Sequence, residues 1–394
     1  MSVKPQFNVF ALMAISAGVI VANMYYVHPL LAEIARTFDI SVSRVGVIAM
    51  FGQAGTAIGM FLFVPLGDVR ERRRLILTLI AVSFFGLIAA ALAPSATALS
   101  LAMMVIGCSG AAVHVIVPFA AHLAAPEERG HVVGTVIGGL LFGILLARTF
   151  SGFIGAHFGW RSVFWIAAGL MVVLSSLIRL GLPTSPPSIS LTWRKLLASI
   201  WKLVREQPLL RESSLLGAIF FCAFSAFWTT LVFLLSTPPY HYGAQMAGLF
   251  GVIGAAGAAG ARPVGRFTDA RGPRVTIRLS LVISILAWVL MLALGFHMTA
   301  LIAGVILLDL GVQSGHVANQ TRIYGIDPGA RGRLNTVYMF SYFVGGALGS
   351  YGGAQCWTLW GWPGVCVFSL AVLVSGYFVQ SCGFAVSAGT LRRQ

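Results

Sequence analysis

Two ionisable residues of this sequence lie deep inside long apolar stretches, where charged side chains are rare. Asp309 lies near the middle of the stretch 299–318, and Arg148 lies near the middle of the stretch 132–154. A charge at such a position costs about 2.5–3.5 kcal/mol on membrane-insertion scales, so both residues are candidates for function. Surroundings of low dielectric favour the neutral form of a carboxyl group, which would let Asp309 carry a proton. The alternative is an Asp309 that stays ionised and holds two helices together.

Asp309 is the first of a row of polar side chains. Asp309, Gln313, His316 and Gln320 follow one another at spacings of 4, 3 and 4 residues. This spacing predicts that all four lie on one face of a helix, opposite a face of Leu, Val and Ile. Lipid would leave such polar groups unsatisfied, so they need water, substrate or polar partners beside them. We expect this face to line a central cavity.

Arg148 admits three interpretations. It binds an anionic substrate, it is the counter-charge of Asp309, or it donates structural hydrogen bonds to nearby carbonyl groups. Further polar and aromatic residues in the apolar stretches are candidates for the same lining, although each of them alone is more often a packing residue. They are Asn23, Tyr25, Tyr26, Gln53 and His114.

The composition requires that these residues sit in membrane helices. Of the 394 residues, 58% are hydrophobic and 9% are charged, whereas a soluble domain carries roughly 25% charged residues. The mean hydropathy is +0.89. The net charge of +15 could suggest nucleic-acid binding, but the Lys and Arg residues fall in short clusters between apolar stretches. Such clusters are typical of cytoplasmic loops, so we expect no nucleic-acid partner.

Twelve stretches are long and apolar enough to cross a bilayer, which takes about 20 residues as a helix. They predict an all-α membrane protein with spans at 7–27, 45–66, 75–92, 99–123, 132–154, 163–182, 215–235, 246–264, 275–295, 299–318, 334–354 and 362–382. The first stretch is too long for the apolar region of a signal peptide, so we interpret it as the first span.

The positions of the basic residues predict the orientation. With both termini in the cytoplasm, the outer loops hold only Arg36, Arg44 and Arg161, and Arg148 lies within a span. The other 22 of the 26 Lys and Arg residues then lie on the inner side. This asymmetry predicts a multi-pass protein of a bacterial-type inner membrane with both termini inside.

The chain divides into two similar halves. Residues 183–213 form the only long polar segment, which predicts a first six-helix half at 1–182, a cytoplasmic linker at 183–213 and a second half at 214–394. The linker is either an amphipathic helix on the membrane surface or a solvated connection. Asp68 and Asp269 lie 201 residues apart in equivalent loops, and Gly159-Trp160 recurs 202 residues later as Gly361-Trp362. Such repeats are typical of secondary transporters.

These loop motifs resemble those of the major facilitator superfamily, over essentially the whole chain. The family's loop between spans two and three carries an acid followed by several arginines, and this sequence has Asp68, Arg70, Arg72 and Arg73 there. A second copy consists of Asp269, Arg271 and Arg274. The segments NMYYVHPLL at 23–31 and GILLARTFSG at 143–152 are similar to those of bacterial drug and metabolite efflux members.

The resemblance implies a gate and a cavity. An acid and several arginines at the inner mouth would bridge helix ends in one conformation and release them in the other, or would only set the topology. Spans one, four, seven and ten would face the cavity, which adds Phe224 and Trp228 of the seventh span. The sequence departs from the family in two places: the fourth span has no arginine, and Gly143-Ile144 stands where the antiporter motif has Gly-Pro.

Several functions find no support in the sequence. The spacings of His114, His122 and His131 do not suit a metal site, and no GxxxxGK or GxGxxG motif is present. We expect no metal, no cofactor and no enzyme activity, because no nucleophile–base pair is found. The cysteines behave as small apolar residues, with a disulfide between Cys356 and Cys366 as the alternative.

The leading hypothesis is therefore a secondary transporter that exports a small apolar or amphipathic compound by alternating access in exchange for protons. One alternative is a transporter of an organic anion, inward or outward, that uses Arg148. A membrane receptor without transport is less favoured. We expect a small-molecule substrate, protons and the lipid bilayer as partners, and a monomeric protein.

Overall fold

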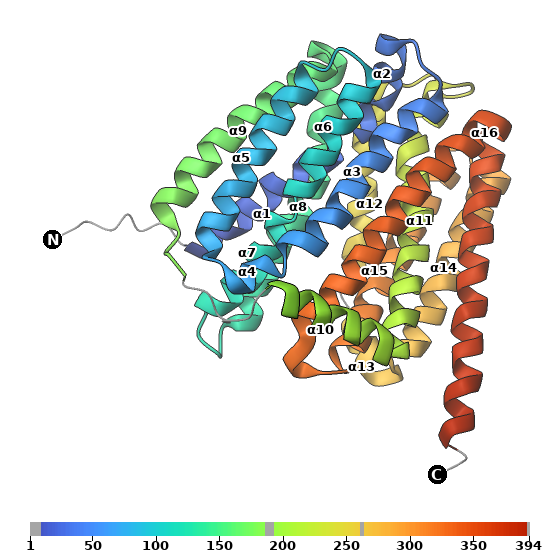
Figure 1. Ribbon diagram of the computed structural model, residues 1–394. Helices are drawn as coiled ribbons and strands as arrows, with labels where there is room; N and C mark the ends of the chain where they lie inside the picture. The colour runs from blue at the N-terminus through green and yellow to red at the C-terminus, as the bar shows by residue number, and fades with distance from the viewer. Residues whose placement is uncertain (1–8, 186–192, 261–263, 392–394) are drawn as a thin grey trace. The chain divides into compact units, whose positions relative to one another are not determined.

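The computed structural model describes residues 9–185, 193–260 and 264–391, and the regular structure in these ranges is helical (Figure 1). The helices of the first part of the chain are α1 (Val9–Tyr25), η1 (His28–Leu30), α2 (Leu31–Phe38), α3 (Val42–Phe63), α4 (Leu66–Val69), α5 (Arg72–Ala91), α6 (Ala96–Ser109), α7 (Ala112–Leu123), α8 (Arg129–Phe158) and α9 (Trp160–Gly181). They are followed by α10 (Trp193–Glu206), α11 (Pro208–Ser236), α12 (Ala244–Gly260), α13 (Val264–Arg271), α14 (Pro273–Leu294), α15 (Met298–Tyr324), η2 (Pro328–Ala330) and α16 (Arg331–Leu391).

The described helices supply the twelve predicted spans. Ten helical segments are long and apolar enough to cross a membrane. One of them, Arg331–Ser381, turns back on itself at Gly361 and so contains two spans (Figure 1). Gly361 has a φ of +59°, which a residue with a Cβ rarely adopts. The shorter apolar helix α12 adds the remaining span. The prediction of an all-α protein with twelve membrane helices is confirmed.

The chain forms two compact units. Unit 1 consists of Met1–Asp39, Phe51–Leu196 and Gly243–Gly251, and unit 2 consists of Ile40–Met50, Leu197–Tyr242 and Val252–Gln394. The first part of α12 thus belongs to unit 1 and the rest of α12 to unit 2. The division of the sequence at 183–213 into two six-helix halves stays a prediction.

Small residues bring the helices of each unit into direct contact. In unit 1, Gly143 of α8 packs on the backbone of α1 at Gly18. In unit 2, Gly345 and Gly349 of α16 pack on the backbone of α11 at Ala218 and Cys222. A Cβ at any of these glycines would overlap the neighbouring backbone, so only glycine permits this approach. α11 is buried along its membrane part, which fixes the positions of the side chains that it carries.

Within the predicted linker, the structure has the helix α10. Its Leu196 and Ile200 are buried, whereas Trp201 and Lys202 on the other side are exposed. The guanidinium of Arg205 lies 5.1 Å from the ring centroid of Trp201. Whether this exposed side lies on the membrane surface stays a prediction.

Candidate functional site

Asp309 lies buried in unit 2, where α15 packs against α12. Its side chain faces Gly254 and Gly257 of α12. A Cβ built on Gly254 would lie 3.1 Å from Asp309 Oδ2 and 3.0 Å from Cζ2 of Trp228, which comes from α11. The carboxyl group and the indole ring therefore lie side by side over Gly254. Three helices position this pair, and α12 has no side chain between them.

The other residues of the polar row face a different helix. Nδ1 of His316 lies 3.0 Å from the hydroxyl of Tyr338 on α16. Nε2 of Gln320 donates to Oδ1 of Asn335, also on α16, at 3.3 Å. Gln313 lies between Asp309 and His316 on α15 and is half-buried. The row is thus continuous along α15. Its end at Asp309 meets α12 and α11, whereas its end at His316 and Gln320 meets α16.

Arg148 is the buried charge of unit 1. It is 3% exposed on α8, and its Cζ lies 5.1 Å from the ring centroid of Tyr25 on α1. The start of α12 covers its aliphatic stem, because a Cβ on Gly251 would lie 3.0 Å from Arg148 Cβ. Thr149 Oγ1 donates to the carbonyl of Gly248 at 3.2 Å and fixes α8 against this part of α12. The guanidinium is therefore held against an aromatic ring at membrane depth, a favourable arrangement for a cation.

The first span is broken beside Arg148. α1 ends at Tyr25, and one turn of 3₁₀-helix leads into α2. Pro29 explains the break, because it has no N–H to donate to the carbonyl of Tyr25 and its ring would clash with that carbonyl in a continued helix. His28 lies in the break, and its ring stacks on that of Tyr25 at 5.9 Å. The predicted span 7–27 corresponds to α1, and beyond the break the helical segment continues through α2 to Phe38.

The remaining predicted lining residues lie in different surroundings. Asn23 donates to Ser83 Oγ at 3.2 Å and to the sulfur of Met171 at 3.4 Å. It therefore faces α5 and α9, away from Arg148. Tyr26 contacts the ring of Phe150 on α8 at 6.0 Å. Gln53 is buried on α3, and His114 is half-buried on α7. Phe224 is buried on α11, with its ring centroid 6.0 Å from that of Trp228.

The arginines of the first loop motif bind within unit 1. Arg73 donates to the carbonyl of Leu182 at 2.9 Å and so joins the start of α5 to the end of α9. Arg72 Nε donates to the carbonyl of Gly67 at 3.2 Å, and Arg70 is exposed. The side chain of Asp68 lies outside the part of the chain that the structure describes. These bonds join helix ends, as expected of this motif, whereas its role in gating stays a prediction.

Glu71 completes this junction, and the sequence analysis missed it. Its carboxylate caps α5 by accepting from the N–H groups of Arg73 and Arg74 at 2.9 and 2.7 Å, and it also accepts from the N–H of Ser185 at 3.1 Å. Burial alone would raise the pKa of Glu71, but these three donors and the charge of Arg73 together hold it below its ordinary value. The signal in the sequence was an acid directly before the first turn of a helix.

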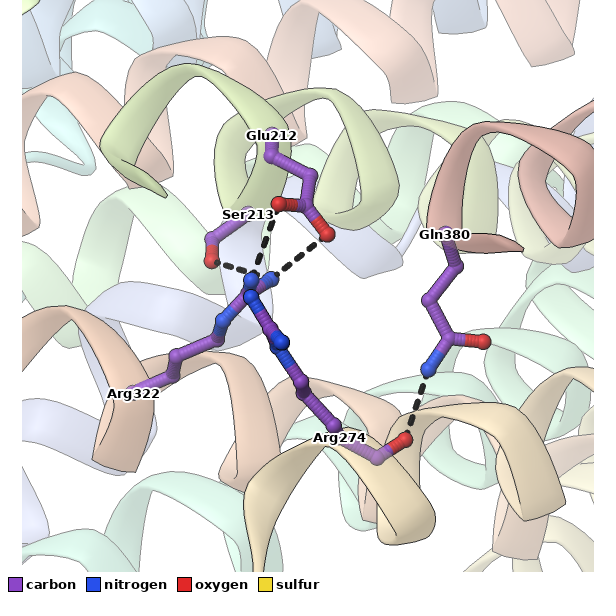
Figure 2. Close-up of polar contacts among 5 residues, drawn as sticks. All are labelled: Glu212, Ser213, Arg274, Arg322 and Gln380. Carbon is purple, nitrogen blue, oxygen red and sulfur yellow. Dashed lines mark hydrogen bonds and ion pairs between the residues drawn. The ribbon is translucent and has the colours of Figure 1, made fainter. Parts of the chain in front are cut away.

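The second loop motif lies near an ion pair of unit 2 (Figure 2). Arg322, in the last turn of α15, donates to both carboxylate oxygens of Glu212 on α11 at 2.9 and 2.8 Å. Arg322 Nη1 also lies 3.4 Å from Ser213 Oγ. The side chain of Arg274, at the start of α14, points towards this pair in Figure 2, and its carbonyl accepts from Gln380 at 2.6 Å. Polar contacts thus join α15 to α11 and α16 to α14 at these helix ends.

For the other two residues of the second motif, Arg271 and Asp269, the described part of the structure gives no bonding partner. Arg271 is exposed at the end of α13, and the side chain of Asp269 lies outside the described residues. Sequence reasoning missed Glu212 and Arg322, because residues 110 positions apart on different helices share no spacing pattern. The signal that could have found Glu212 is its rarity, since the chain has only 11 acidic residues.

The described residues also bear on the expectations about metal sites and disulfides. Among the residues that the structure describes, no group of three or more His, Cys, Asp or Glu side chains could hold a metal ion. Cys108, Cys222, Cys356 and Cys366 are free thiols, so the alternative of a disulfide between Cys356 and Cys366 was wrong for this structure.

Comparisons with known proteins agree with this architecture. The family model described as Major Facilitator Superfamily matches residues 13–350. The chain is 43% identical over 381 residues to the "Uncharacterized transporter YgaY" of Escherichia coli O157:H7, covering 95% of each protein. It is 34% identical over 367 residues to the "Probable transporter SCO4007" of Streptomyces coelicolor, covering 93% of this chain and 85% of that protein. The crystal structure of the nucleoside transporter NupG matches with a TM-score of 0.77 at 14% identity, covering 95% of this chain and 99% of the other, which is a likeness of fold alone.

Proposed function

This chain belongs to the major facilitator superfamily of secondary transporters, and on that premise we propose that it exports a small apolar or amphipathic compound in exchange for protons. The observation that carries the proposal is Asp309, an acid buried at 4% exposure beside the indole of Trp228 and the glycine face of α12. An ionisable side chain buried within a membrane span is a candidate for function by its cost alone. A carboxyl group that changes its protonation with its surroundings can couple a proton to substrate movement.

The cycle follows from alternating access. Asp309 takes up a proton from the outer side, and the neutral acid permits the change to the inward-open state. It releases the proton to the cytoplasm, and the compound then binds and leaves on the outer side. One proton that moves down a potential of 100 mV supplies about 2.3 kcal/mol, enough to drive export without ATP. The wall that the compound meets in unit 2 consists of Trp228, Phe224, Gln313 and His316.

The orientation and the gate belong to the same proposal. The positive-inside distribution supports cytoplasmic termini in an inner membrane. The bonds of Arg73 and Arg322 then lie at the inner ends of their units and hold the helices of each unit together while the units exchange conformations. We propose a monomeric transporter, since both polar groups lie within one chain.

An anion transporter that relies on Arg148 is the second candidate, favoured by the buried guanidinium beside Tyr25. The two candidates differ in their response to Arg148→Gln. This substitution abolishes transport of an anion, but it leaves transport of a neutral or cationic compound largely intact.

Untargeted profiling of cells and medium tests the proposal. Cells that overproduce the protein are compared with cells that produce Asp309→Asn at the same level. The control is Asp39→Asn, because Asp39 is exposed and has a φ of +50°, which asparagine adopts as readily as aspartate. We expect a compound to leave the cells with the wild type and the control and to stay inside with Asp309→Asn. Equal export by all three proteins would remove Asp309 from the coupling mechanism.

A further inference from the structure

Two arginines of unit 1 lie exposed where the start of α5 meets the end of α9. These two helices pack side by side (Figure 1). Arg73 Nη1 donates to the carbonyl groups of Arg179 and Leu182 at 3.5 and 2.9 Å, which brings the two helix ends together. Arg74 lies in the first turn of α5, and Arg179 lies in the last turn of α9. Both side chains are exposed at this end of the helix pair.

Arg74 continues the exposed apolar face of α5. Arg74, Thr78, Val82 and Phe85 follow one another at spacings of 4, 4 and 3 residues, and all four side chains are exposed. Such spacing places them on one face of the helix. Phe85 is 67% exposed. An apolar face of a membrane helix that the protein leaves uncovered meets the acyl chains of the lipids, and the arginine lies at its end.

α9 has the same arrangement. Val172, Ser176 and Arg179 follow at spacings of 4 and 3 residues and are exposed, and Leu180 beside Arg179 is 78% exposed. The opposite faces of the two helices meet Asn23, which donates to Ser83 of α5 and to Met171 of α9. The exposed faces of α5 and α9 therefore point away from the interior of unit 1.

The neighbouring charged groups bind within the unit. The carboxylate of Glu71 accepts from the N–H groups of Arg73, Arg74 and Ser185, and the guanidinium of Arg73 binds the end of α9. Arg74 takes part in these bonds through its N–H, and Arg179 takes part through its carbonyl. Both of their guanidinium groups remain exposed.

Two cations at the end of an exposed apolar face suit an anionic phospholipid. Basic residues at the cytoplasmic ends of membrane helices attract anionic headgroups, and guanidinium groups bind phosphate through charge-assisted hydrogen bonds. The amine of a zwitterionic lipid offsets part of this attraction. A second copy of the chain is less suited to the same faces, because a two-fold axis along the membrane normal would gather four arginines at one end of the contact.

We propose that Arg74 and Arg179 bind the phosphate of phosphatidylglycerol, whose acyl chains lie along the exposed faces of α5 and α9. The lipid then joins the two helices from the membrane side, at the end where Arg73 joins them through hydrogen bonds. This site goes beyond the proposed function, since it concerns the membrane rather than the exported compound. It uses the cytoplasmic orientation of this helix end and does not depend on Asp309.

Native mass spectrometry of the full-length protein tests the site. The protein is released from detergent with equal amounts of phosphatidylglycerol and phosphatidylcholine that carry the same acyl chains, and the ratio of the two bound lipids is measured. We expect the wild type to bind more phosphatidylglycerol. Arg74→Gln and Arg179→Gln should each lower the ratio about fivefold, the contribution of one basic residue near an anionic headgroup. Equal binding of both lipids by the wild type would overturn the proposal.

Two control variants separate the site from charge in general. Arg129→Gln removes one positive charge from the start of α8, where Arg129 is exposed and follows Glu127 and Glu128, and it should leave the ratio unchanged. Arg74→Lys should keep most of the preference, since lysine also binds phosphate as a point charge. An equal decrease in Arg129→Gln and Arg74→Gln would contradict a specific site.

The variant with both arginines replaced by glutamine gives the sharpest result. We expect it to lose most of the preference for phosphatidylglycerol, and a wild-type ratio would overturn the proposal. If this variant does not fold, the two single variants decide. A dimer without bound phosphatidylglycerol in the wild-type spectra would mean that a second copy covers these faces, which would also overturn it.

Discussion

Arg322 and Glu212 form a bidentate ion pair that joins the end of α15 to the start of α11, with N–O distances of 2.9 and 2.8 Å. The side chain of Arg322 is 5% exposed and that of Glu212 is 18% exposed. Each charge also lies at the favourable end of its helix dipole, the cation in a last turn and the acid near a first turn. The pair has no counterpart at the equivalent positions of the first half, Phe10 and Ala120.

Breaking this pair should destabilise unit 2. Glu212→Gln leaves the buried guanidinium of Arg322 without its counter-charge, which costs about 3–5 kcal/mol for a fully buried pair and less here because Glu212 is partly exposed. We expect a lower unfolding temperature of the detergent-solubilised protein. The control is Lys202→Gln, which removes an exposed pair of 3.8 Å and changes stability by less than about 0.5 kcal/mol. Equal unfolding temperatures for Glu212→Gln and the wild type would show that the pair is not a structural link.

A methyl group at position 254 of α12 should lower proton-driven export by displacing Asp309 or Trp228. In Gly254→Ala the new Cβ lies 3.1 Å from Asp309 Oδ2 and 3.0 Å from Trp228, so one of the two side chains must move. We expect proton-driven export to decrease while the amount of folded protein stays near that of the wild type, as measured by transport and by size-exclusion profile. Gly134→Ala is the matched control, since its Cβ has no neighbour within 4 Å and alanine favours the helix. Undiminished export by Gly254→Ala would mean that the site tolerates a displaced Asp309.

Glu71 should make stability depend on pH in acid. Its pKa is lowered in the folded protein, so its contribution is complete above the unfolded value of about 4.3 and is lost as the pH falls through the folded value. Glu71→Gln removes the charge and at least one accepting oxygen of the cap, and we expect a loss of about 0.5–2 kcal/mol at pH 7. The unfolding temperatures of wild type and variant should converge as the pH is lowered below about 4. A constant difference across the titration would exclude this carboxylate as the cause.

The fold followed from the sequence because apolar length and the distribution of arginines report directly on membrane helices. The positions of Asp309 and Arg148 within spans were predictable for the same reason. The direction in which Asn23 points was not, because its helix is apolar on every side and no periodicity distinguishes the face towards α5 and α9. The break in the first span had a signal in Pro29, which lies just beyond the predicted end of that span.

Contacts between residues far apart in the sequence could not be predicted from its patterns. Tyr338 contacts His316 because α16 packs against α15 there. No periodicity in a single sequence indicates which helices pack together at a given level. The same holds for Trp228 and Asp309, which lie together only because Gly254 leaves space between α11 and α15. The chemistry of the residues was therefore predictable, whereas their partners depended on the packing of three helices.

Proton coupling by Asp309 is tested most directly in proteoliposomes with the compound that profiling identifies. Two fluxes are compared for wild type and Asp309→Asn: uphill transport driven by a pH gradient, and exchange of labelled for unlabelled compound without net proton movement. We predict that Asp309→Asn retains exchange and loses uphill transport, because only the latter needs a group that binds and releases a proton. Uphill transport by Asp309→Asn at the wild-type rate would contradict the role of Asp309.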